Sequence, residues 1–160
     1  MLEIEQKFTF RYIPFSELNI LHHTVIFRQY LSINPEVRIS KRVFDDGTVK
    51  YHLTVKEVNY IVRKESKIEL TETQYLELSS AAEKCPMIYD VWSFKTDNDK
   101  IISFKVGKNI KSAFAEIEYH DIGEYLIFKD EWVKYPYIGR EVTLDDRYYV
   151  KNVWREYCSE

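Results

Sequence analysis

Charged and apolar residues alternate with a period of two through most of this chain. Near the N-terminus, Glu3, Glu5 and Lys7 alternate with Ile4 and Phe8. The same alternation recurs at 37–43, 51–56, 65–70 and 114–119. A two-residue period puts successive side chains on opposite faces and is typical of β-strands. Further candidate strands at 24–33, 87–95 and 100–106 bring the expected number to about eight.

Helical periodicity is confined to a few segments. The clearest spans 72–84, where Thr71 and Gln74 are spaced as a capping box. Shorter helices are expected near 15–22 and 148–156. Few helices among many strands indicate one antiparallel, strand-rich α+β domain covering residues 1–160.

Composition narrows the classes of function. The 160 residues include 23 basic and 26 acidic ones, giving a net charge of −3. A nucleic-acid binder usually has a basic excess, so no nucleic-acid partner is expected. Charge at the extreme N-terminus and the lack of long apolar runs argue against a signal peptide or membrane span. Only two cysteines, Cys85 and Cys158, indicate a reducing compartment, so we expect a cytoplasmic protein.

The charged faces of these strands allow two interpretations. In an open sheet the charged face meets water, and opposite charges on neighbouring strands form modest cross-strand pairs. In a closed barrel of about eight strands, the same side chains would line a bore wide enough for one small ligand. Grouped carboxylates in such a bore would repel one another unless a hard divalent cation joined them. Lysine and arginine on the other walls would suit phosphate oxygens.

Specific motifs favour the second interpretation. The opening sequence Glu3-Ile4-Glu5-Gln6-Lys7 resembles the Glu-x-Glu-x-Lys signature of the CYTH superfamily, the triphosphate tunnel metalloenzymes. Further segments resemble that family's pattern in the same order: 35–39, 53–56, 63–70, 115–118 and 139–148. The resemblance therefore extends over nearly the whole chain.

This resemblance implies a closed eight-stranded antiparallel barrel with a charged interior, flanked by a few helices. It also implies hydrolysis of a triphosphate, inorganic or organic, with Mg²⁺ or Mn²⁺. The implied catalytic carboxylates, which hold metal or orient its water, are Glu3, Glu5, Glu116 and Glu118. Glu69 is expected to join these four as a metal ligand. The implied phosphate-binding residues are Lys7, Arg38, Lys56 and Lys67.

The sequence departs from the family pattern at several positions. Ser40 stands where the basic strand usually has its second arginine, and Lys67 replaces a glutamate. Aligned with the family, Asp90 and Trp92 occupy the place of a Lys-x-Arg pair on a tunnel wall, and Ile102 lies where an acidic residue is common. Trp92 would then offer a stacking face to a ring inside the tunnel, or would simply pack.

Several functions therefore stay open. A phosphoanhydride hydrolase is the first, and a catalytically weak polyphosphate- or nucleotide-binding module of the same fold is the second. Adenylate cyclase activity is a third that no residue favours. A sheet with a solvated charged face is the remaining alternative, and a homodimer is compatible with all of them. Adjacent His22 and His23 do not share a strand face, so a histidine metal site is not expected.

Overall fold

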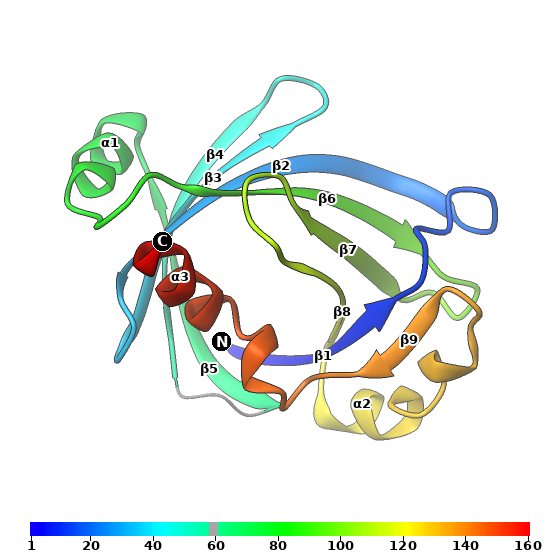
Figure 1. Ribbon diagram of the computed structural model, residues 1–160. Helices are drawn as coiled ribbons and strands as arrows, with labels where there is room; N and C mark the ends of the chain where they lie inside the picture. Colours follow the sequence, from blue (N-terminus) through cyan, green and yellow to red (C-terminus); the bar gives the residue numbers. More distant parts are fainter. Residues whose placement is uncertain (58–60) are drawn as a thin grey trace.

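The structure, a computed structural model, describes residues 1–57 and 61–160 and contains a closed ring of antiparallel strands (Figure 1). In the described part, eight strands follow one another around the ring as β1-β5-β4-β3-β2-β6-β7-β8, and β8 pairs again with β1. Their bounds are β1 (Leu2–Phe10), β2 (Asn19–Ser32), β3 (Glu36–Phe44), β4 (Val49–Lys56), β5 (Val62–Leu70), β6 (Met87–Lys95), β7 (Ile101–Gly107) and β8 (Ala113–Tyr119). The predicted closed barrel of the α+β class is confirmed.

Strand β1 closes the ring. Its first residues pair with β5, Glu3 lying opposite Arg63, and its middle pairs with β8, Glu5 lying opposite Glu118. Beyond the residues that pair with β5, the same edge of β1 pairs with a ninth strand, β9 (Ile138–Glu141). The N-terminal alternation therefore sits at the seam of the barrel.

The two faces of the strands have different surroundings. Glu3, Glu5 and Lys7 of β1 point into the bore, whereas Ile4 and Phe8 belong to an apolar layer outside the wall. That layer is covered by β9, the short helix α2 (Ile122–Phe128) and the 3₁₀ turn η1 (Trp132–Lys134). Its fully buried members include Phe94, Ile102, Phe104, Ile117, Trp132 and Ile138. Burial of the outer face thus forces the charged face inward.

A second apolar cluster lies inside one end of the ring. Helix α3 (Val150–Ser159), which follows the 3₁₀ turn η2 (Asp146–Tyr148), places Trp154 and Tyr157 against inward-facing side chains of the strands. These partners are Ile26, Tyr30, Met87, Tyr89 and Phe114. In Figure 1 the helix lies within the outline of the ring. This end of the bore is therefore filled by packed side chains.

Two local predictions are confirmed. Helix α1 (Glu72–Ser80) begins at Thr71, and the capping box with Gln74 is formed. A helix over 148–156 was expected, and α3 occupies most of that segment. None of the described helices is long and apolar enough to cross a lipid bilayer.

The helix expected near 15–22 is wrong. A turn closed by the Leu18 amide and the Pro14 carbonyl occupies the first residues, and β2 already begins at Asn19. The chain has to reverse between β1 and β2, and pairing of Asn19 and Ile20 with β6 outweighs local helix propensity. The elements α2 and β9 were not predicted, since both are short.

Candidate functional site

The inward faces of the strands surround a cavity of about 490 Å³. Eight of its lining side chains are basic: Lys7, Arg28, Arg38, Arg42, Lys56, Arg63, Lys67 and Lys105. Five are acidic: Glu3, Glu5, Glu65, Glu116 and Glu118. The cavity walls thus carry an excess of positive charge in a chain whose net charge is −3. Such a site favours a polyanion.

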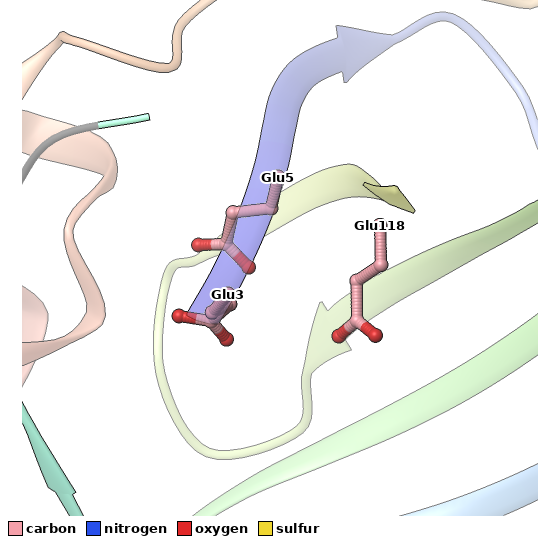
Figure 2. A group of neighbouring side chains, drawn as sticks. All are labelled: Glu3, Glu5 and Glu118. Atoms are coloured by element: carbon pink, nitrogen blue, oxygen red, sulfur yellow. The ribbon is translucent and has the colours of Figure 1, made fainter. Parts of the chain in front are cut away.

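Three carboxylates meet at the seam between β1 and β8 (Figure 2). Glu3, Glu5 and Glu118 each offer an oxygen within 4.8 Å of the other two. Like charges directly opposite each other on neighbouring strands are destabilising, and Glu5 lies opposite Glu118. Burial, together with the charge of Glu116, raises the pKa of Glu5 and raises that of Glu118 to about 7. Among the described residues, Glu118 has no cation within 4.0 Å, whereas Glu5 is contacted by Arg63.

The fourth predicted carboxylate lies apart from this cluster. Glu116 Oε1 is 2.9 Å from Lys105 Nζ. Burial alone would raise the pKa of Glu116, but Lys105, Lys7 and Lys56 outweigh it and hold the pKa below its ordinary value. Glu116 is therefore ionised and already paired with a lysine.

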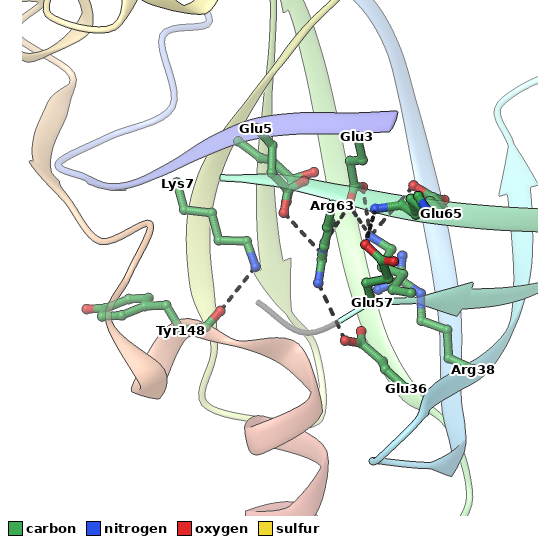
Figure 3. Close-up of polar contacts among 12 residues, drawn as sticks. Glu3, Glu5, Lys7, Glu36, Arg38, Glu57, Arg63, Glu65 and Tyr148 are labelled. Atoms are coloured by element: carbon green, nitrogen blue, oxygen red, sulfur yellow. Dashed lines mark hydrogen bonds and ion pairs between the residues drawn. The ribbon is translucent and has the colours of Figure 1, made fainter. Parts of the chain in front are cut away.

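One arginine links several acids in the wall (Figure 3). Arg63 Nε lies 2.7 Å from Glu3, and its two terminal nitrogens lie 3.3 Å from Glu5 and 3.4 Å from Glu36. Lys56 Nζ adds a contact of 2.7 Å to Glu3. Burial would raise the pKa of Glu3, yet Lys56 and Arg63 lower it to about 2. Glu3 is thus the best neutralised member of the cluster.

The cluster fits a hard divalent cation. Mg²⁺ and Mn²⁺ prefer carboxylate oxygens, and three of them converge here on a cavity open to water. Glu5 and Glu118 are the members with unbalanced charge. Glu69, also predicted as a ligand, is exposed and lies outside both the cluster and the residues lining the cavity.

All four predicted phosphate-binding side chains line the cavity. Lys7 is buried, with Nζ 3.4 Å from the Tyr148 carbonyl and 5.0 Å from the centre of the Phe114 ring. Burial lowers the pKa of Lys7 and lowers that of Lys56 to about 8. Arg38 and Lys67 lie on β3 and β5. Both have no carboxylate within 4.0 Å in the part of the chain that the structure describes.

The expected positions of Asp90, Trp92 and Ile102 require correction. Asp90 and Trp92 lie on the outer face of β6, where the Trp92 ring stacks on His23 at a centroid distance of 4.8 Å. Ile102 belongs to the apolar layer outside the wall. The face on which a residue lies depends on strand register, because a shift of one residue exchanges the two faces of a strand. Trp92 therefore packs and offers no stacking face inside the tunnel.

Four basic residues of the cavity were missed as site residues: Arg28, Arg42, Arg63 and Lys105. The period of two could have found Arg42, which shares a face with Arg38 and Ser40. Arg28 could not be assigned in this way, because its register against β3 is known only from the structure. The missed residues enlarge the cationic part of the site.

No protein-family model and no curated protein matches the sequence. Among solved structures, the inorganic triphosphatase NE1496 is 26% identical with a TM-score of 0.63, over 94% of this chain and 96% of that one. PH1819 from Pyrococcus horikoshii OT3 is 16% identical with a TM-score of 0.67, over 96% and 99%. HpAC1 from Hippeastrum, which is described as having a dominant triphosphatase activity, is 12% identical with a TM-score of 0.63, over 97% and 95%.

These likenesses extend over nearly the full length of each chain and agree with the closed barrel described above. The chain has the CYTH-like fold of the triphosphate tunnels.

Proposed function

We propose that this chain hydrolyses a small triphosphate inside its tunnel with the help of Mg²⁺ or Mn²⁺. The observation that carries the proposal is the cluster of Glu3, Glu5 and Glu118 in a cavity with more cations than acids. The likeness to the inorganic triphosphatase NE1496 supports inorganic tripolyphosphate as the first substrate to test.

Acidic and basic residues of the cavity would have different roles. Glu5 and Glu118 would hold the divalent cation, with Glu3 completing the group and Glu116 keeping Lys105 in place. Lys7 and Lys56, with Arg38 and Lys67, would bind phosphate oxygens. When bound, the metal neutralises phosphate charge and lowers the pKa of a water molecule. Because α3 fills one end, substrate would enter from the other.

The test is phosphate release from tripolyphosphate with Mg²⁺ or Mn²⁺ and with EDTA. We expect turnover only with metal, and a loss of at least a hundredfold in Glu5→Gln and Glu118→Gln. Glu77→Gln, which removes an exposed carboxylate from α1, serves as the matched control. Turnover in EDTA, or full activity in both tunnel variants, would contradict the proposal.

One observation favours a second function, a binding module without turnover. Arg63 already contacts Glu3 and Glu5. Its guanidinium therefore neutralises part of the negative charge with which these carboxylates would bind a metal. Calorimetric titration separates the two functions: a module binds tripolyphosphate tightly and releases no orthophosphate. To test for the cyclase activity named for HpAC1, the protein is incubated with ATP and the products are analysed for cyclic AMP by chromatography.

A further inference from the structure

Arg28 is a buried cation that the sequence comparison with the family did not single out. It lies on β2, is 5% exposed and lines the cavity. Its Nε is buried without a hydrogen-bond partner, and no carboxylate of the described residues lies within 4.0 Å of it. Burial, and then the charge of Arg38, lowers the pKa of Arg28 to about 10, so the side chain is still charged at neutral pH. A buried charge without a partner is costly unless something outside the chain completes it.

The position of Arg28 explains the departure at Ser40. The two residues lie directly opposite each other on β2 and β3, and both line the cavity. Directly opposed residues have Cβ atoms roughly 5 Å apart, close enough for one long side chain to fill the space beside a short one. A serine at position 40 leaves that space free, and the guanidinium of Arg28 enters the bore from the neighbouring strand.

Arg28 also belongs to a larger group of cations that have no carboxylate within 4.0 Å among the described residues. We define the cationic wall as Arg28, Arg38, Arg42 and Lys67, from β2, β3 and β5. Arg38 and Arg42 both lower the pKa of Arg28, and Arg28 contributes to lowering that of Lys67 after burial and Arg42. These side chains repel one another in the metal-free protein, whereas Lys56, Arg63 and Lys105 have glutamate partners.

We propose that Arg28 binds a phosphate group of the substrate and supplies from β2 the guanidinium that Ser40 lacks on β3. This inference rests on the proposed function, because it assigns one contact within the same tunnel. The ligand chemistry is a chain of phosphates, whose adjacent charges need several cations. Arg28 and Arg38 would contact the same end of that chain.

The experiment exchanges the two side chains across the strand pair. Tripolyphosphate binding is measured by calorimetry with EDTA present, so that neither metal nor turnover is needed. Arg28→Ser is expected to weaken binding at least tenfold, and the double variant Arg28→Ser/Ser40→Arg is expected to recover most of that loss. Lys41→Ser is the matched control, since Lys41 lies on the outer face of β3 over the Phe27 ring and outside the cavity lining.

Melting temperatures distinguish a binding role from a structural one. Removing an unpaired buried charge should leave the ligand-free melting temperature unchanged or higher. Arg28→Met keeps the length of the side chain and replaces Arg28→Ser if the serine variant does not fold. A lower melting temperature with unchanged affinity would overturn the proposal, as would affinity equal to that of Lys41→Ser. If the unmodified protein does not bind tripolyphosphate, the proposed function fails first, and the role of Arg28 fails with it.

Discussion

At Arg63, a single guanidinium contacts Glu3, Glu5 and Glu36 in the wall of the bore. Replacing it by methionine leaves these carboxylates without that charge. Breaking a buried ion pair typically costs about 3–5 kcal/mol, so we expect Arg63→Met to lower the free energy of unfolding by that amount in EDTA. Urea denaturation measures it.

Divalent cations should rescue part of this loss. Mn²⁺ can neutralise the carboxylates that Arg63 no longer contacts, so it should raise the melting temperature of Arg63→Met more than that of the unmodified protein. An equal effect of Mn²⁺ on both proteins would contradict this prediction and show that Arg63 and the metal do not compete for these carboxylates.

Glu118 makes the metal-free protein sensitive to pH. Its side chain is solvent-accessible within the cavity, where partial desolvation and the charge of Glu116 raise its pKa from an ordinary 4.5 to about 7. Between pH 4.5 and 7 the folded state keeps a proton that the unfolded state releases, so the free energy of unfolding falls as pH rises through this range. Above pH 7 the loss is complete.

The glutamine variant tests this sign. In EDTA we expect the melting temperature of Glu118→Gln to fall less between pH 5 and 8 than that of the unmodified protein. Glu77→Gln, on the exposed surface of α1, should follow the unmodified protein. Parallel curves for all three proteins would refute the raised pKa of Glu118.

Among the elements, helix α3 is the one whose packing closes the bore. Trp154 is 3% exposed and packs with Val150 and Tyr157 against the inward faces of the strands. A buried tryptophan replaced by alanine typically costs about 3–5 kcal/mol, so Trp154→Ala should lose that much stability. Arg155→Ala, at an exposed position on the same helix, should change stability by less than about 0.5 kcal/mol. Urea denaturation compares the two, and equal stabilities would mean that α3 does not pack as described.

Predictability from sequence differed between elements for physical reasons. Long strands such as β1 can be predicted from sequence, because one face is polar and the other apolar and the alternation extends over many residues. The four residues of β9 form a strand only because the edge of β1 is free beyond β5. Closure of the barrel was implied by the family resemblance. The alternation of charged and apolar residues does not predict closure, because the strands of an open sheet show the same alternation.

The same limit applies to the site. Glu3, Glu5 and Lys7 share one face of one strand, so their grouping was visible in the sequence. Which cations face them depends on the register between strands, which also places Asp90 and Trp92 on the outer face. That Arg28 lies opposite Ser40 follows only from the register between β2 and β3 in the structure.

For the whole molecule, the bore holds charges that only partly balance one another. Among the described residues, Glu118 of the carboxylate cluster has no cation within 4.0 Å, and the cationic wall has no carboxylate within 4.0 Å, although Arg63 contacts Glu3 and Glu5. A triphosphate with a divalent cation has the complementary distribution, with negative charge for the wall and positive charge for the cluster. The ligand-free fold is therefore less stable than the fold with both bound.

This imbalance gives a prediction for stability. At a ligand concentration a hundredfold above Kd, binding adds about 2.7 kcal/mol. For a domain of this size, we expect tripolyphosphate with Mg²⁺ to raise the melting temperature by roughly 5–10 °C. Orthophosphate at the same concentration carries less charge and is too short to contact both the wall and the cluster, so it should have little effect. Because the stabilisation arises from both charged regions, Arg38→Gln and Glu5→Gln should each reduce it, and Lys41→Gln on the outer face should not. Differential scanning calorimetry checks this, and equal shifts with orthophosphate and tripolyphosphate would show that the two charged regions do not act on one ligand.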